Sequence, residues 1–306
     1  MSPNFFFGDF TKHSFLALSL GLWALASQAT PLELEQYPEE RIYTSADRGY
    51  TQYGAPSRHG RSRYSLTFDD GPHEIYTPKL LDVLKKHQAR ATFFVITSRI
   101  GDKQIPLIKR MLDEGHLVVS HGQSHDNSNT ISKLDWKRKV KQSFLDLKKI
   151  YQKAGHEFKG FYYRFPYAAY GIRKDHHHMN TLKEISAELF GGNCIQFAFW
   201  DIDSGDWIPK MTSAEVAQNL ISNHEGGKYI DYKTVTLPNG SKTQIKVPKT
   251  ITNPLGGGVV LGHDVQGHTP QGIDQFLSYA SQNAISIIPL PEVEEFALKE
   301  GCQFKE

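Results

Sequence analysis

Two groups of side chains in this sequence have the chemistry of a metal site. Asp69 and Asp70 are adjacent acids, and His121 and His125 lie four residues apart. Two imidazoles at that spacing fall on one face of a helix, and a tight loop can bring them together in the same way, so the pair can chelate a metal ion. One carboxylate from the acidic pair completes a set of two histidines and one acid, the ligand set of an open catalytic zinc site.

The acidic pair also has a simpler interpretation as a turn. Asp, Gly and Pro are residues that turns prefer, so Asp69-Asp70-Gly71-Pro72 alone is typical of a turn with solvated acids. Leu66 and Phe68 alternate with polar neighbours, which predicts a half-buried strand that ends at these acids. Adjacent strand residues face opposite sides, so both carboxylates can serve one site only if the strand bends here.

The strands and helices that must position these side chains alternate along the chain. Such units close into a barrel or an open doubly wound sheet. No Gly-rich phosphate fingerprint follows the first strand, which disfavours a dinucleotide-binding fold. We therefore expect an α/β fold, a distorted (β/α) barrel with about seven parallel strands. The expected strands lie at about 64–68, 91–97, 117–119, 161–165, 195–200, 257–261 and 285–290.

Capping signals locate several of the helices between these strands. Thr77 before Pro78 predicts a helix start, and Thr212 with Glu215 forms a capping box. A long amphipathic helix is expected from 135 to 154, where Gly155 ends it.

One segment interrupts the alternation of strands and helices. Residues 233–237 and 243–247 flank Pro238-Asn239-Gly240-Ser241, which predicts a β-hairpin within an insertion at 225–254. The hairpin either shapes substrate access at the active face of the barrel or stabilises the surface.

Polar residues gather just beyond the predicted carboxyl ends of the strands. In a barrel, that face carries the active site, so acid, imidazole and guanidinium groups from five strands would meet there. The residues concerned are Asp69, Asp70, His121, His125, Arg164, Asp203, Asp206 and His263.

The composition excludes some classes of protein. The chain has 306 residues, a net charge of +2, 39% hydrophobic and 12% aromatic residues. These values fit a soluble globular protein and exclude a nucleic-acid polycation or a disordered acidic chain, so we expect no nucleic-acid partner.

The first residues differ from the rest. Ser14 to Ala26 is nearly all apolar, follows Lys12 and precedes the small-residue pattern Ser27-Gln28-Ala29. We interpret residues 1–29 as a signal peptide, with an uncleaved anchor or a buried helix as alternatives. Residues 30–63 are expected to be an extended arm and 64–306 the folded domain. The mature protein would then be secreted or periplasmic, without a stable membrane span.

Secretion affects the interpretation of the two cysteines. Cys194 and Cys302 form either a disulfide in an oxidising compartment or two buried thiols.

Five segments, in their order along the chain, resemble the motifs of the polysaccharide deacetylase family with NodB homology, which is carbohydrate esterase family four. The resemblance covers Tyr64 to about Leu290, and the ordered set is far more specific than any single motif. The matching segments are Thr67-Phe68-Asp69-Asp70-Gly71-Pro72, His121 to His125, Arg164-Phe165-Pro166-Tyr167, Asp203-Ser204-Gly205-Asp206-Trp207 and Val260-Leu261-Gly262-His263.

This resemblance implies a metal-dependent hydrolase. Asp70, His121 and His125 would bind the metal, with Asp69 the general base for the attacking water. Arg164 would pair with Asp69 and lower its pKa. Zinc is the expected ion, with cobalt or nickel as alternatives.

The resemblance also implies which residues act on the leaving amine and which contact the acetyl group. His263 would protonate the departing amine, and Asp206 would raise the pKa of His263. The backbone N–H of Tyr167 would hold the oxyanion, while Trp207 and Leu261 would line a pocket for the acetyl methyl group.

The sequence departs from the family pattern in two places. Gly122 stands where Ser or Thr is frequent, and Phe165 stands where Pro is frequent. Neither change removes a catalytic group. A histidine cluster at Asp175-His176-His177-His178 lies outside the motifs, and we expect a surface loop there rather than a second metal site.

The predicted function is deacetylation of N-acetylated amino sugars in peptidoglycan. Chitin or another N-acetylated glycan is the alternative substrate, and the sugar position is open. A catalytically silent carbohydrate-binding homologue and an amidohydrolase of small cyclic amides are further alternatives. Aromatic residues near the strand ends would either stack on sugar rings or close the core; they are Tyr162, Tyr163, Tyr167, Tyr170 and Trp207.

Overall fold

The computed structural model describes residues 62–170, 177–293 and 296–305. The predicted signal peptide at 1–29 and almost all of the predicted arm at 30–63 lie outside these residues. No helix among the described residues is long and apolar enough to cross a membrane.

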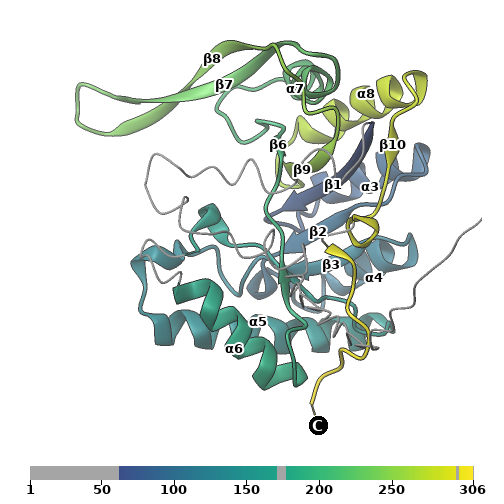
Figure 1. Cartoon of the computed structure of the whole chain (residues 1–306), viewed down its shortest axis with the longest axis vertical. Coiled ribbons are helices and arrows are strands. Elements are labelled where there is room, and N and C mark those ends of the chain that lie inside the picture. The colour runs from purple at the N-terminus through teal and green to yellow at the C-terminus, as the bar shows by residue number, and fades with distance from the viewer. Residues whose placement is uncertain (1–61, 171–176, 294–295, 306) are drawn as a thin grey trace, which may run out of the picture.

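A parallel sheet forms the centre of the fold. The described residues contain eight strands of this sheet, ordered β5-β4-β3-β2-β1-β9-β6, with β10 also paired to β1. The sheet curves into a half-barrel, which confirms the predicted distorted (β/α) barrel (Figure 1). The strands are β1 (Arg63–Asp69), β2 (Thr92–Val95), β3 (Leu117–Ser120), β4 (Tyr162–Tyr163), β5 (Gln196–Phe197), β6 (Ile202–Asp203), β9 (Gly258–His263) and β10 (Ser286–Ile287).

Each of the seven predicted strands has a counterpart, but β4 and β5 are shorter than expected. In both, only two residues pair in the ladder, while the apolar residues around them pack into the core without a strand partner. The short strand β6 has no separate signal in the sequence because its two residues follow the predicted strand at 195–200 after only one residue, Asp201.

Six α-helices flank the sheet in the described residues, and the predicted caps explain some of their ends. The capping box of Thr212 and Glu215 is present, and Gly155 ends its helix in a left-handed conformation. The expected Thr77 cap is wrong, since the helix begins at Tyr76 and the Thr77 hydroxyl donates to Asp264 instead. The helices are α3 (Tyr76–Lys86), α4 (Ile105–Asp113), α5 (Lys133–Ala154), α6 (His177–Phe190), α7 (Ser213–Glu225) and α8 (Thr269–Gln282).

The expected surface loop around the histidine cluster is partly wrong. Its last histidine, His178, lies within α6 and is fully buried. Its Nε2 lies 2.7 Å from the carbonyl oxygen of Ser128, and its ring packs against Trp136. His178 therefore contributes to the core, while residues 171–176 lie outside the described residues.

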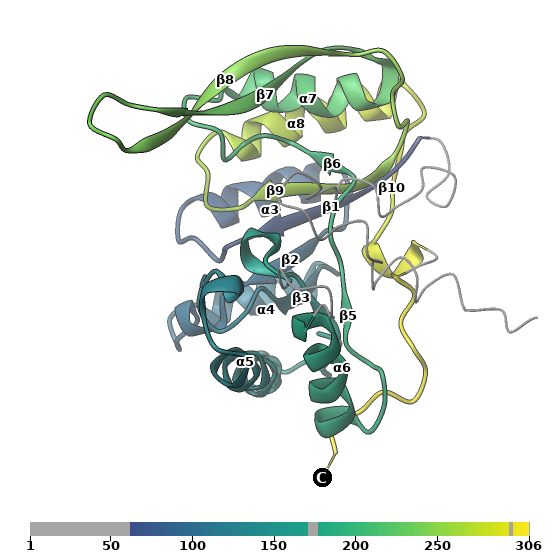
Figure 2. The same ribbon diagram turned by 60° about the vertical axis from the view of Figure 1, so that its left-hand side comes forward.

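The predicted hairpin is present as a separate antiparallel sheet of two strands. It consists of β7 (Gly227–Thr236) and β8 (Lys242–Ile251), and both strands are longer than predicted. The hairpin packs against α7 and projects from the body on the side toward which β1 runs (Figures 1 and 2). The insertion thus extends toward the end of the barrel where the strands terminate.

A disulfide bond joins Cys194 to Cys302. It fastens the C-terminal segment to the chain just before β5, beside the larger apolar cluster. Of the two possibilities that the sequence leaves open, the structure therefore has the bonded pair.

Candidate active site

A bend at the end of β1 brings the two adjacent acids to one side of the sheet. Asp70 has a φ of 77°, a left-handed conformation that is uncommon for residues other than glycine. The guanidinium of Arg99 donates to the Asp70 carbonyl at 2.7 Å, which holds the bend. In a regular strand the two adjacent carboxylates would point to opposite faces of the sheet. The left-handed conformation of Asp70 breaks this alternation, so both carboxylates can serve one site.

Asp70, His121 and His125 form a cluster that can hold a metal ion. Their ligand atoms all lie within 4.8 Å of one another. Asp70 Oδ1 lies 3.5 Å from His121 Nε2 and 3.2 Å from His125 Nε2. That oxygen is buried and has no hydrogen-bond partner among the described residues. A buried carboxylate oxygen that faces two imidazole nitrogens fits a divalent cation.

The environment of His121 suits it to metal binding. Its Nδ1 lies 2.9 Å from the carbonyl oxygen of Arg164, and a carbonyl can only accept, so Nδ1 carries the proton and Nε2 is free to coordinate. Burial lowers the pKa of His121 to about 3, which keeps the ring neutral.

Asp69, the last residue of β1 before the bend, pairs with Arg164. The guanidinium Nη1 donates to Asp69 Oδ1 at 2.8 Å, and both side chains are almost completely buried. We expected Arg164 to lower the pKa of Asp69, and its charge does act in that direction. The net direction is the opposite, because burial raises the pKa of the Asp69 carboxyl by more.

Arg164 also connects strands across the half-barrel. Its Nη1 donates to the Thr67 hydroxyl on β1 at 2.7 Å, and its Nε and Nη2 donate to the carbonyls of Ala198 and Phe199. Its guanidinium lies over the ring of Phe94. These contacts fix the orientation of the guanidinium that faces Asp69.

His263 lies beside Asp69 on the neighbouring strand and pairs with Asp206. The two strands place Asp69 and His263 in register, and His263 Nδ1 lies 2.7 Å from Asp206 Oδ1. Although burial opposes protonation, the charge and hydrogen bond of Asp206 raise the pKa of His263 to about 10. Asp206 is itself held by the His263 backbone N–H and the Thr269 hydroxyl.

Two loop residues near the metal ligands have left-handed backbones. Gly122 has a φ of 92°, and a Cβ there would lie 3.2 Å from the Ser124 carbonyl oxygen, so the turn explains why glycine replaces Ser or Thr. Tyr167 has a φ of 57°. Its ring packs against that of His125 at a tilt of 53°, with centroids 4.5 Å apart, and the residue is 58% exposed. Its N–H donates to no other residue in the described parts of the chain.

The predicted substrate residues differ in their exposure. Leu261 is buried, while Trp207 is partly exposed, and its indole N–H donates to both carboxylate oxygens of Asp203. Tyr162, Tyr163 and Tyr170 are buried in the core. Tyr167 and Trp207 are therefore the two aromatic residues of the predicted set that remain available to a ligand.

Three further residues lie beside the site, outside the set predicted from the sequence. Asp264 is fully buried against Gly71 and accepts from Thr77. Asn219 and Tyr232 contact the loop that carries Asp206 and Trp207. The Asn219 and Tyr232 contacts join segments far apart in the sequence, and no local pattern indicates them.

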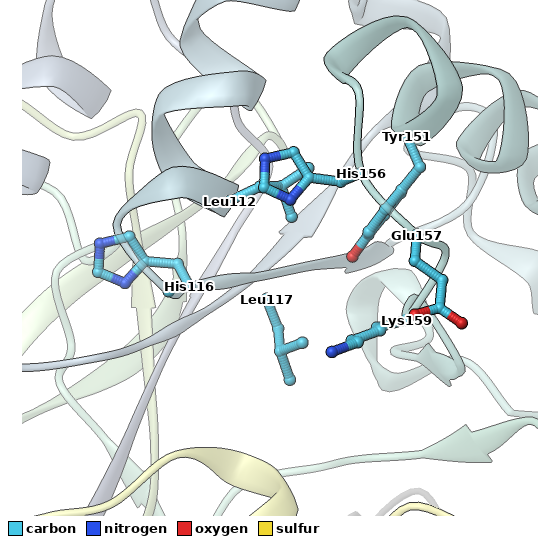
Figure 3. A pocket seen from close by; sticks show the side chains of 8 residues that line it. Leu112, His116, Leu117, Tyr151, His156, Glu157 and Lys159 are labelled. Atoms are coloured by element: carbon cyan, nitrogen blue, oxygen red, sulfur yellow. The ribbon is translucent and has the colours of Figure 1, made fainter.

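The structure has a pocket of about 290 Å³ at the opposite end of β3 from His121. Figure 3 shows that the side chains around it point in different directions rather than toward one centre. His116 is buried at its edge, where burial lowers the pKa of the ring to about 4. This pocket takes no part in the candidate active site.

The sequence profile of the polysaccharide deacetylase family matches residues 57–183. A peptidoglycan-N-acetylglucosamine deacetylase of Bacillus cereus is 31% identical over 220 residues, which are 68% of this chain and 74% of the relative. A chitooligosaccharide deacetylase of Sinorhizobium fredii is 33% identical over 173 residues, 56% of this chain and 70% of the relative. Other relatives match over less of their own length: the chain spans 58% of a second Bacillus cereus peptidoglycan deacetylase and 42% of one from Listeria monocytogenes.

Solved structures share the fold. A family 4 acetyl xylan esterase from Clostridium thermocellum, in complex with a cobalt ion, aligns with a TM-score of 0.53 and 24% identity over 76% of this chain and 89% of its own.

Proposed function

Because this chain belongs to the polysaccharide deacetylase family, we propose that it is a secreted, metal-dependent hydrolase that removes N-acetyl groups from amino sugars of peptidoglycan. The observation that carries this proposal is the arrangement of three groups at the ends of β1, β3 and β9. A metal-binding cluster, the base candidate Asp69 and the acid candidate His263 lie around one site. A protein that only bound glycans would need neither a base nor an acid.

The proposed reaction is hydrolysis of an acetamide. When bound to Asp70, His121 and His125, a divalent cation lowers the pKa of water from about 15.7 toward about 7 and polarises the substrate carbonyl. Asp69 accepts the proton of the attacking water. The Tyr167 N–H donates to the oxyanion that develops at the acetyl carbonyl oxygen, a contribution of about 3 kcal/mol for one aligned donor.

The departing amine needs a proton because an amide anion is a poor leaving group. His263 supplies it, and Asp206 keeps His263 protonated near neutral pH. The products are acetate and a free amino group on the sugar. Base and acid thus act on opposite sides of the scissile C–N bond.

Zinc is the proposed metal. Two imidazoles and one carboxylate are typical zinc ligands, and such a site has an open position for water. The donor set also accepts cobalt or nickel, and the cobalt ion named with the Clostridium thermocellum esterase supports this wider range.

Peptidoglycan is our first choice of substrate because a secreted enzyme would meet it in the cell wall. Several relatives bear the name peptidoglycan-N-acetylglucosamine deacetylase. Chitin oligomers are the second candidate, which the 33% identity to a chitooligosaccharide deacetylase favours.

Mass spectrometry of glycans treated with the zinc-loaded protein tests the proposal. We expect loss of acetyl groups from peptidoglycan, on glucosamine or on muramic acid, together with release of acetate. The Asp69→Ala variant serves as the control. Acetate release no greater than that of this control, on peptidoglycan and on chitin oligomers, would show that the chain is a silent homologue.

Secretion has its own test. N-terminal sequencing of the protein recovered from the medium or periplasm should give a mature chain that begins after Ala29. An intact N-terminus in the membrane fraction would indicate an anchor instead.

A further inference from the structure

A buried amide fastens the hairpin to the loop that carries Asp206 and Trp207. Asn219 on α7 is 1% exposed. Its Nδ2 donates to the Ser204 carbonyl at 3.0 Å and to the Ile230 carbonyl at 2.8 Å, and its Oδ1 accepts from the Ile230 N–H at 2.7 Å. One side chain therefore uses both of its polar atoms to fix β7 relative to this loop.

A second attachment holds the other strand of the hairpin. Lys246 on β8 donates to Glu215 Oε1 at 2.6 Å and Oε2 at 2.9 Å, and to the Lys210 carbonyl at 3.0 Å. Lys246 is the cross-strand partner of Tyr232. The hairpin is thus held on both strands at the level of Tyr232, so this part is not a freely moving arm.

Tyr232 extends the aromatic surface that begins at Trp207. The ring centroids lie 4.7 Å apart with the planes at 70°, an edge-to-face contact. The Trp207 indole is fixed by the two oxygens of Asp203. Tyr232 remains 40% exposed, so part of its ring is open to a ligand while the rest supports the indole.

We propose that Tyr232 is a specificity-determining residue that binds a sugar unit beyond the one that is deacetylated. The apolar face of a pyranose presents C–H groups that pack on an aromatic ring. Because Trp207 follows Asp206, the partner of the acid candidate His263, a glycan strand that places its acetamide at the site passes the aromatic pair. The inference rests on the proposed function, since it assumes that a glycan occupies the site.

The alternative role of Tyr232 is packing alone, with the hairpin a stabilising insertion. The two roles differ in what they do to chain-length preference. A sugar contact acts only on substrates long enough to reach the hairpin. Loss of packing would lower stability and affect short and long substrates alike.

The test compares Tyr232→Ala with Tyr229→Ala. Tyr229 lies on the same strand, three residues away, so its side chain points to the opposite face. We expect the gain in kcat/KM from a disaccharide to a longer N-acetylglucosamine oligomer to shrink about tenfold in Tyr232→Ala, the upper end of what one aromatic contact contributes. The loss should fall mainly on KM, and Tyr232→Phe should restore most of it. An equal effect of Tyr229→Ala, or an unchanged chain-length gain in Tyr232→Ala, would overturn the proposal.

Binding separates a failure of this inference from a failure of the proposed function. Calorimetry with the longer oligomer needs no turnover, and the Asp69→Asn background prevents hydrolysis. If the wild type released no acetate but Tyr232→Ala still weakened oligomer binding about tenfold, the sugar contact would stand and the enzymatic proposal would fail. If the Asp69→Asn proteins with and without Tyr232→Ala bound the longer oligomer equally and had equal unfolding midpoints, the proposed sugar contact of Tyr232 would be refuted.

Discussion

The guanidinium of Arg164 lies 2.8 Å from the carboxylate of Asp69, and the two side chains are 0% and 4% exposed. Burial disfavours the charged form of each partner, so it raises the pKa of Asp69 and lowers that of Arg164. The pair is stable only because each charge has the other as its counterion and Arg164 makes three further hydrogen bonds. A site that needs an ionised base in its interior therefore depends on one arginine.

Replacing Arg164 should destabilise the whole fold. Arg164→Met leaves the Asp69 carboxylate buried without a counterion, and we expect a loss of about 3–5 kcal/mol in the free energy of unfolding. Urea denaturation measures it. Lys109→Met is the matched control because it breaks an exposed ion pair with Asp113 and should cost less than about 1 kcal/mol. Similar losses in the two variants would contradict the structural role of the buried pair.

Replacing Asp69 and replacing Asp70 should have different effects on the zinc content of the protein. Asp70→Asn removes the carboxylate that faces His121 and His125, so zinc content should fall strongly. Asp69→Asn removes the proposed base and leaves those three ligands in place, so zinc should stay bound while acetate release is lost. Atomic emission of the dialysed proteins gives the metal content. Equal zinc content in the two variants would mean that the base and ligand roles are wrongly divided.

Much of the fold is predictable from local patterns in the sequence. Strand and helix periodicity gives the parallel half-barrel, and the capping box at Thr212 is visible as a pair of residues. The site is predictable for the same reason, since the ends of parallel strands meet at one face.

The features that were missed depend on long-range contacts and burial. The hydroxyl of Thr77 has an acceptor 187 residues away in Asp264, so a capping pattern at Thr77 cannot reveal its actual partner. The net pKa direction of Asp69 depends on how deeply β1 is buried, which residue types do not report. The contact between Tyr232 and Trp207 depends on how the hairpin folds back over α7.

The pH dependence of activity should depend on Asp206. Activity needs protonated His263, so it falls as pH rises through the pKa of that ring. In the wild type Asp206 raises this pKa to about 10. In Asp206→Asn the carboxylate charge no longer opposes the effect of burial on His263, so the pKa of His263 falls. The alkaline limb of kcat/KM should therefore move to lower pH. An alkaline limb at the same pH in both proteins would exclude His263 as the acid that Asp206 controls.

Gly71 should not tolerate a side chain. A Cβ there would lie 2.0 Å from Asp264 Oδ2, which accepts from the Thr77 hydroxyl at 2.6 Å. Gly71→Ala should therefore destabilise the fold by about 1–3 kcal/mol and displace the adjacent ligand Asp70. Gly101→Ala is the control because its nearest neighbour would lie at 3.6 Å. In an Asp264→Ala background, Gly71→Ala should cost less, and additive losses would argue against a direct clash.

The disulfide should contribute strongly to stability, because Cys194 and Cys302 close a loop with a sequence separation of 108 residues. Loop-closure entropy for such a length corresponds to about 4–5 kcal/mol. Cys194→Ser, Cys302→Ser and the double variant should all lose nearly the same free energy of unfolding, since either change breaks the same bond. Protein made in an oxidising compartment should release thiols only after unfolding and reduction. Additive losses from the two single variants, or two thiols that titrate without reductant, would show that the cysteines are independent.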